Sequence, residues 1–321
     1  MAKSSGQDPQ NTTPTSLPKR KPASITQSYV KTSIDQRFPN VIYGYAGSDH
    51  IEGGGGNDVI YSGGGKDYID GGTGIDTLSY ADSWSKVVAN LVTGIGQGGT
   101  AAYDTILNIE NLVGSKFDDI LTGDAGNNTL NGGAGKDILH GGAGADLLIG
   151  GSGADVLDGG DGVDTASYSN AHTGVTLSLL TGGTINADAS QNGIQPVVTK
   201  ICCPDDLLAN GDGAAPVDGS YTAVNGVTDA TGDTYIGIEN VLGSAFNDKI
   251  TGDAGDNRLN GGAGNDILNG GGGNDMLTGG AGADVFQFSA DFGNDTITDF
   301  WFGLGRTDRV PIDWHRYSQL G

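Results

Sequence analysis

Aliphatic residues recur at every ninth position over three stretches of the chain. Residues 114–167 divide into six nonapeptides, from GSKFDDILT to GGDGVDTAS, in which Gly is first, an acid or its amide is sixth and an aliphatic residue is eighth in all but the last, which has Ala. The same register covers residues 41–79 and 243–287. The three residues after the acid predict a short strand whose central side chain points inward. Two nonapeptides, which span eighteen residues, then predict one turn of a flattened parallel coil.

Two connectors, residues 80–113 and 168–242, break this period but resemble each other. Apolar residues alternate with a period of two in both, which indicates strands with one buried face. The first part of one connector recurs in the other at an offset of 88 residues, and the last part at an offset of 129 residues. We therefore expect irregular β turns of the same solenoid, with insertions on one side. The recurring residues are Val87, Ala89 and Leu91 with Val175, Leu177 and Leu179, and Ile109–Leu112 with Ile238–Val241.

The predicted fold is all-β, a parallel β-roll or β-solenoid of glycine-rich repeats in three blocks. Residues 183–232 have no clear period and are expected to loop out. The expected organisation is a flexible N-terminal arm at 1–40, a first block at 41–79, a connector at 80–113, a second block at 114–167, a connector with a long insertion at 168–242, a third block at 243–287, and a C-terminal cap with a secretion-signal region at 288–321.

The sixth position of each repeat predicts a metal site. Glycines tolerate positive φ, so a GGxGx segment bends sharply and turns its carbonyl oxygens inward, and the acid closes the loop with a carboxylate. Such an all-oxygen set suits a hard cation, and we predict calcium. The candidate ligands are Asp49, Asp58, Asp67, Asp76, Asp119, Asn128, Asp137, Asp146, Asp155, Asp164, Asp248, Asn257, Asp266, Asp275 and Asp284.

Stacking of the coils predicts which of these residues are neighbours. Successive turns lie roughly 4.8 Å apart, so each acid should lie near the acid eighteen residues away, with an ion between them. The candidate pairs are 49/67, 58/76, 119/137, 128/146, 137/155, 146/164, 248/266, 257/275 and 266/284. The two pairs that contain Asn lose one formal charge and should be the weakest.

Composition indicates that folding depends on the cation. The 321 residues include 59 glycines, only 36% are hydrophobic, and the formal net charge is −23. One buried aliphatic side chain in nine residues is little apolar burial against the entropy of ordering the chain. We therefore expect the metal-free chain to be largely unfolded, with cation binding and folding as one event.

The nonapeptides resemble those of the RTX (repeat-in-toxin) family, whose hemolysin-type calcium-binding repeats form a parallel β-roll. This resemblance implies a secreted, extracellular calcium-binding protein. It also implies a type I secretion apparatus as a partner, which exports such proteins through an uncleaved C-terminal signal. Residues 301–321 are shorter and more basic than the usual tail of this family.

Several other chemistries find no support in the sequence. There is no HExxH helix for zinc, no G-x-S-x-G elbow and no EF-hand loop, so we expect no enzyme. No run of eighteen apolar residues predicts a transmembrane segment. The cluster Lys19–Lys21 is too small to predict nucleic-acid binding. Cys202 and Cys203 are adjacent and lack further ligands, so they predict neither a disulfide framework nor a metal site.

Three functions are compatible with this pattern. The leading one is a calcium-binding β-roll with a matrix, adhesion or host-interaction role, which contacts an extracellular polysaccharide or a host surface. The second is an accessory module of an extracellular polysaccharide-modifying enzyme or protease. The third, a membrane-active RTX protein, lacks the apolar helices expected of pore formers.

Overall fold

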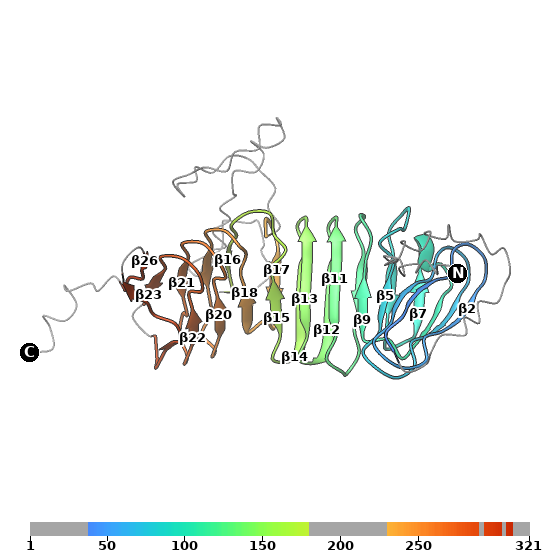
Figure 1. The fold of residues 1–321 in the computed structure, drawn as a ribbon, viewed down its shortest axis with the longest axis horizontal. Coiled ribbons are helices and arrows are strands. Elements are labelled where there is room, and N and C mark those ends of the chain that lie inside the picture. The colour runs from blue at the N-terminus through green and yellow to red at the C-terminus, as the bar shows by residue number, and fades with distance from the viewer. Residues whose placement is uncertain (1–37, 180–229, 289–291, 304–305, 311–321) are drawn as a thin grey trace, which may run out of the picture.

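Each nonapeptide folds into one strand and one loop, and successive strands alternate between two faces of a roll. The computed structural model describes residues 38–179, 230–288, 292–303 and 306–310. Most strands are three residues long, with the eighth residue of the repeat buried at the centre, as in Tyr68–Asp70 and Ile120–Thr122. The strands stack side by side along the long axis of the molecule (Figure 1). The predicted all-β parallel β-roll is confirmed.

One face is a single sheet of eleven strands that runs the length of the roll, in the order β1-β3-β5-β9-β11-β13-β15-β18-β20-β22-β24. All its pairings are parallel. Its strands are β1 (Val41–Tyr43), β3 (Val59–Tyr61), β5 (Thr77–Ser79), β9 (Asn111–Val113), β11 (Thr129–Ala134), β13 (Leu147–Ser152), β15 (Thr165–Ser167), β18 (Asn240–Leu242), β20 (Arg258–Asn260), β22 (Met276–Thr278) and β24 (Thr296–Ile297).

The other face is divided into two sheets. The first has nine strands in the order β17-β14-β12-β10-β6-β7-β8-β4-β2, and the second has four in the order β16-β19-β21-β23. The nine are β2 (His50–Glu52), β4 (Tyr68–Asp70), β6 (Val88–Asn90), β7 (Ile95–Gln97), β8 (Thr105–Leu107), β10 (Ile120–Thr122), β12 (Ile138–Gly144), β14 (Val156–Gly162) and β17 (Thr234–Ile236). The four are β16 (Thr176–Ser178), β19 (Lys249–Thr251), β21 (Ile267–Asn269) and β23 (Val285–Gln287). A short 3₁₀ helix, η1 (Gly99–Ala101), and an antiparallel pair, β25 (Phe302–Gly303) and β26 (Arg306–Thr307), complete the described elements.

The register between neighbouring turns of a block is eighteen residues. Leu121 therefore pairs with Leu139, and Leu139 with Leu157. All three side chains are fully buried. The eighth-position side chains thus form a continuous aliphatic column through the interior, because each one packs on its equivalents in the turns before and after it.

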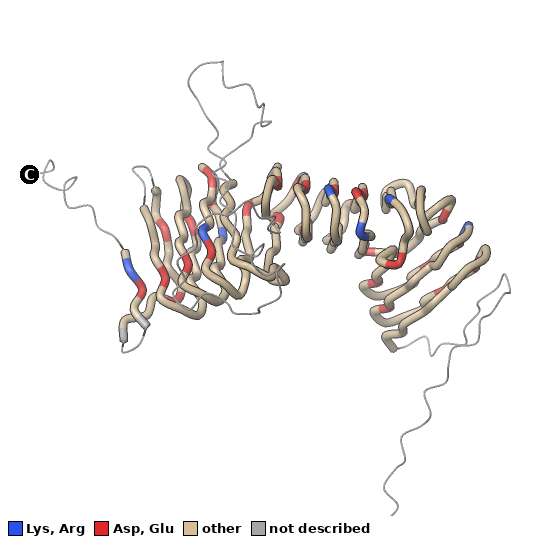
Figure 2. The backbone as a smooth tube through the Cα atoms, turned by 90° about the horizontal axis from the view of Figure 1, so that it is seen from above, with Lys and Arg blue, Asp and Glu red and all other residues tan. Residues whose placement is uncertain are grey.

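The first connector adds strands to one face only. Between β4 and β10 the nine-stranded sheet contains β8, β7 and β6, whereas between β5 and β11 the other face contains only β9. β7 pairs antiparallel with both β6 and β8. The coils at the N-terminal end lie at an angle to those in the middle of the roll (Figure 2). We attribute this change of direction to the two extra strands, which widen one face.

The second connector repeats this arrangement in part. β16 pairs with β19, as β6 pairs with β10, and β17 pairs with β14, as β8 pairs with β4. The sheet is interrupted between β17 and β16. Most of the insertion expected at 183–232 lies outside the described residues, as do Cys202 and Cys203, residues 1–37 of the expected arm, and residues 311–321.

The segment after the third block forms one more imperfect coil. β24 pairs in parallel with β22, which places Ile297 beside Leu277. Its spacing from β22 is twenty residues rather than eighteen. Asp299 closes this end of the roll, since its two carboxylate oxygens accept hydrogen bonds from the backbone N–H groups of Gly279 and Gly280 at 2.8 and 2.7 Å.

We predict that the aliphatic column carries much of the stability of the calcium-loaded fold. Replacing the fully buried Leu139 by Ala should lower the free energy of unfolding by about 2–5 kcal/mol, since a cavity forms between Leu121 and Leu157. The neighbouring Ile138 is half-buried on the outer side of the same strand, so Ile138→Ala is the matched control and should cost much less. Urea denaturation in excess calcium measures both, and equal losses would contradict the inward-facing column.

Candidate metal sites

The fifteen candidate ligands are all buried at the ends of the coils. Each lies where a loop turns into a strand, directly before the first strand residue, as Asp119 precedes β10 and Asp155 precedes β14. None has more than 4% of its surface exposed. Charged side chains are rarely buried to this extent without a partner. Their burial therefore indicates that the loops are built around them.

A backbone hydrogen bond joins each of the nine predicted pairs. The N–H group of one residue donates to the Oδ1 atom of the residue eighteen positions later, at 2.7–2.9 Å. Asp119, Asp137 and Asp155 are linked in this way into one column along an edge of the roll, and Asn128, Asp146 and Asp164 into another. The residues that the sequence pairs are thus brought together in the structure.

The second carboxylate oxygen faces the inside of the loop. The Oδ2 atom of Asp137 is buried and makes no hydrogen bond. A Cβ atom built on Gly132 would collide with this oxygen and would also lie 2.7 Å from the carbonyl oxygen of Gly150 in the next turn. The first glycine of the repeat therefore leaves a small space where a carboxylate and a carbonyl oxygen converge. Oδ2 atoms with the same lack of a partner belong to Asp49, Asp58, Asp67, Asp76, Asp146, Asp164 and Asp266.

Glycine is required in this loop by backbone geometry. Gly133 and Gly135, the second and fourth residues of one repeat, have φ of 102° and 128°. A side chain at Gly133 would collide with the carbonyl oxygen of Ser115 in the turn before. The two glycines thus allow the sharp bend and the close stacking of carbonyl oxygens that the sequence predicts.

Acids outside the nonapeptide register extend the columns. The N–H groups of Asp67 and Asp155 donate to the carboxylates of Asp104 and Asp233, and those of Asp76 and Asp164 to Glu110 and Glu239. Asp295 and Asp308 play the same part at the C-terminal end. Spacing alone misses these residues, since they follow their partners by 20 to 78 positions. The 129-residue repeat between connectors, which includes Glu110 and Glu239, is the signal that could have identified four of them.

Four candidate ligands already have protein partners for their oxygens. Both carboxylate oxygens of Asp119 accept hydrogen bonds from Ser115, one from its N–H group and one from its hydroxyl. Ser244 donates in the same way to Asp248. The Oδ1 atoms of Asn128 and Asn257 accept from the N–H groups of Asp124 and Asp253, each at 2.8 Å. The first two loops of the second and third blocks are therefore closed by hydrogen bonds.

In each connector a buried tyrosine donates a hydrogen bond to one of the acids that extend the columns. The hydroxyl group of Tyr80 donates to Asp104 at 3.2 Å, and that of Tyr168 donates to Asp233 at 2.6 Å. Both tyrosines are almost completely buried. A tyrosine hydroxyl thus donates to the second carboxylate oxygen, which has no protein donor in nonapeptide loops such as that of Asp137.

Burial shifts the pKa of the stacked carboxyl groups upward. Desolvation, reinforced by the carboxylates of adjacent turns, raises the pKa of Asp67 and of Asp137 to about 7. The same causes raise the pKa of Asp266 to about 8. A divalent cation would remove this penalty, because it supplies the positive charge that the surrounding protein lacks.

The donor set fits calcium. Across the described ranges, no three His, Cys, Asp or Glu side chains converge to hold a metal ion. A cation in these loops would therefore combine few carboxylates with several backbone carbonyl oxygens, a combination that calcium accepts because it takes six to eight oxygen ligands in flexible geometry. The partnerless Oδ2 atoms and the spaces beside the first glycines are consistent with such an ion.

A parallel β-roll with loops of this kind defines a class of calcium-binding repeat protein. The family model of the RTX calcium-binding nonapeptide repeat (4 copies) matches residues 43–78, 108–139, 131–166, 233–268, 251–286 and 261–297. The chain belongs to the RTX family, and the predicted cofactor, calcium, is confirmed, since nonapeptide repeats of this family bind calcium. Comparison with curated proteins finds no match. None of the helices in the described parts of the chain has the length and apolar character needed to cross a membrane.

We predict that protons partly replace calcium in stabilising the fold. The folded carboxyl groups of Asp67 and Asp137 have pKa values of about 7 and that of Asp266 has a pKa of about 8, against about 3.9 in an unfolded chain. Between these values the folded state binds more protons than the unfolded state, so the stability of the metal-free fold decreases as pH rises. In chelator, circular dichroism should therefore show more β structure at about pH 5.5 than at about pH 8, and calcium should restore it at the higher pH. A β signal that is equal or larger at the higher pH would contradict the buried state of these groups.

Proposed function

We propose that this RTX protein is a secreted, non-enzymatic calcium-binding β-roll that folds outside the cell and acts in a matrix, in adhesion or at a host surface. The observation that carries the proposal is the set of buried Oδ2 atoms that lack a hydrogen-bond partner and face loop carbonyl oxygens. These atoms would destabilise a metal-free roll, because a buried charge without a partner costs several kcal/mol. Calcium turns the same atoms into ligands.

The open carboxylates are the principal ligands in this proposal. Asp137, Asp146 and Asp164 each bind the backbone of the preceding turn through one oxygen and offer the other to the cation. The remaining candidates take the same position in the other coils. Asp119, Asn128, Asp248 and Asn257 contribute least, because protein donors already occupy their oxygens.

Calcium-dependent folding supports an extracellular location. Weak extracellular calcium sites have dissociation constants of about 10⁻⁴–10⁻³ M, and cytoplasmic free calcium is expected to be far lower. With a net charge of −23 and empty loops, the chain would stay unfolded inside the cell and could pass through a type I secretion channel. Outside, millimolar calcium would load the loops and drive folding by mass action.

The proposal predicts a sharp and selective response to calcium. In chelator at neutral pH the purified chain should show little β structure, and it should gain it between about 0.1 and 10 mM calcium. Magnesium should produce much less, because it demands a small octahedral site. Circular dichroism during titration with each ion measures both responses. Full β signal and a cooperative melt in chelator would show that calcium is incidental to the fold.

Loss of one carboxylate should change the calcium concentration at half-folding only if that carboxylate lies in one of the columns. Asp137→Asn keeps an oxygen that can accept from the N–H group of Asp119 but removes one ligand charge. The calcium concentration at half-folding should therefore rise, on the order of tenfold. Asp158→Asn removes the same charge from an outward position beside His140 and is the matched control, which should leave the midpoint nearly unchanged. Equal shifts would mean that calcium responds to total charge rather than to these loops.

A further inference from the structure

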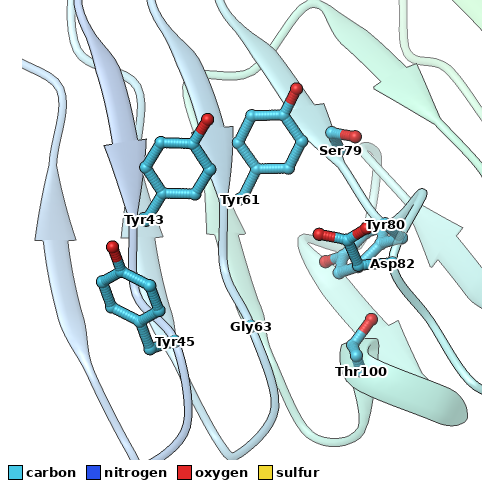
Figure 3. Close-up of a pocket in the computed structure, with 8 residues that line it drawn as sticks. All are labelled: Tyr43, Tyr45, Tyr61, Gly63, Ser79, Tyr80, Asp82 and Thr100. Carbon is cyan, nitrogen blue, oxygen red and sulfur yellow. The ribbon is translucent and has the colours of Figure 1, made fainter. Parts of the chain in front are cut away.

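Two exposed tyrosines and a half-buried one form a group on the eleven-stranded face at the N-terminal end of the roll. Tyr43 ends β1, Tyr61 ends β3, and Tyr45 lies in the loop after β1. The rings of Tyr43 and Tyr61 are nearly parallel, with centroids 4.9 Å apart and an interplanar angle of 8°, and the centroid of Tyr45 is 6.0 Å from that of Tyr43. Figure 3 shows the first two rings side by side with their hydroxyl groups pointing the same way and Tyr45 beside them. We call Tyr43, Tyr45 and Tyr61 the tyrosine platform.

The tyrosine platform forms one wall of a hollow of about 430 Å³. Ser79, Asp82 and Thr100 lie across the hollow (Figure 3); Ser79 and Asp82 bring a hydroxyl and a carboxylate group, whereas the hydroxyl of Thr100 is buried. Among the residues that the structure describes, no Lys or Arg lines it. A volume of this size is in the range of small-ligand sites, which combine aromatic surface with a few polar groups.

A second hollow in the same chain can be compared with this one. The second hollow lies at an offset of 88 residues, where Ser167, Tyr168 and Asn170 stand in place of Ser79, Tyr80 and Asp82. At the positions of Tyr43, Tyr45 and Tyr61, the second hollow has Asn131, Gly133 and Ile149. The two coils have the same fold, so the β-roll itself does not require the tyrosines.

Tyr45 is also held in a strained conformation. Its φ of 68° lies in the left-handed region, which glycine occupies at this position of other repeats, as in Gly54 and Gly133. A side chain with Cβ is disfavoured there. Such strain persists mainly where it serves a function. This conformation places the ring of Tyr45 beside that of Tyr43, where 40% of the surface of Tyr45 stays exposed.

The chemistry of the hollow selects among possible ligands. Nucleic acids and anionic polysaccharides need basic side chains for their charges, and here the lining has none while the whole chain carries −23. A neutral sugar ring has an apolar C–H face that packs on an aromatic ring, and hydroxyl groups that hydrogen-bond to Ser, Thr and Asp. Tyrosine suits such a ligand because it has an apolar body and a polar tip.

We propose that the tyrosine platform, together with Ser79 and Asp82, binds a neutral saccharide unit of an extracellular polysaccharide. This inference rests on the proposed extracellular function and assigns a partner to it. Because β1 and β3 carry two of the three tyrosines, the site requires the folded, calcium-loaded roll.

Native electrophoresis of the full chain in millimolar calcium tests the proposal. Gels contain a soluble neutral polysaccharide (mannan, dextran or hydroxyethyl cellulose) or carboxymethyl cellulose as the charged counterpart of the last. We expect at least one neutral polymer to retard the chain and the charged one to do so far less. Tyr43→Ala and Tyr61→Ala should each weaken binding roughly tenfold, which corresponds to about 1.4 kcal/mol.

Two further variants separate binding from folding. Tyr45→Gly should weaken binding while raising the thermal stability of the calcium-loaded protein, because it removes the strained φ. Ile149→Ala changes the residue equivalent to Tyr61 in the second hollow and should leave binding unchanged. A purely structural role for the tyrosines predicts the opposite for Tyr45→Gly, with lower stability.

Each contrary outcome has a distinct meaning. A chain that folds in calcium but is retarded by none of the neutral polymers, or equally by carboxymethyl cellulose, overturns the saccharide proposal and leaves calcium-dependent folding intact. Retardation that survives all three tyrosine substitutions also overturns it. Concentration-dependent dimerisation that Tyr43→Ala abolishes would assign the platform to a second copy of the chain instead. Failure to gain β structure in calcium would refute the proposed function and, with it, the folded site.

Discussion

The structure depends on one repeated interaction, the hydrogen bond from a backbone N–H group to the carboxylate of the acid one turn later. In the column of Asp119, Asp137 and Asp155 this bond fixes the eighteen-residue register. The same register places Leu121, Leu139 and Leu157 in contact. One oxygen of each carboxylate therefore aligns the coils while the column gathers negative charge at their edge. The same carboxylates that align the coils also repel one another, and a cation between the loops would neutralise this repulsion.

The connectors meet part of this constraint with side chains of the protein. Where the nonapeptide register fails, acids still extend the columns, and in each connector a tyrosine hydrogen-bonds to one of them, Tyr80 to Asp104 and Tyr168 to Asp233. At the start of the second block Ser115 takes the same part for Asp119. These pairs lie at the junctions between blocks, so hydrogen bonds within the protein stabilise the junctions. In the function proposed above, the repeats between the junctions fold on binding calcium, and the roll then joins calcium-dependent stretches through hydrogen-bonded ones.

The spacing of residues in the sequence predicts their positions in the structure well wherever the contacts repeat regularly. Both the burial of Leu139 and the pairing of Asp137 with Asp155 follow from counting residues, because each turn repeats the one before it. Counting residues does not predict the position of Asp308, since it follows Asp284 by twenty-four positions rather than eighteen. Counting residues does not predict the antiparallel strand β7 either. Its position depends on where β6 and β8 lie, and those strands are placed by coils on either side of the connector.

Within each repeat, some positions determine folding and others face outward, which explains how one fold can acquire different partners. First, second, fourth, sixth and eighth positions are constrained by the loop, the column and the core, so substitutions there act on folding. The outward strand positions carry no such constraint, which is why Tyr61 and Ile149 occupy equivalent places in two hollows that lie 88 residues apart in the sequence. Tyr45 is the exception, because it takes a position that glycine fills in most other repeats and has a φ of 68°. The side chain of Tyr45 works against the loop geometry, and it lies beside the stacked rings of Tyr43 and Tyr61. A bound ligand explains this arrangement better than the needs of the roll do. The outer face can therefore carry recognition, while the loops and the core carry calcium-driven folding.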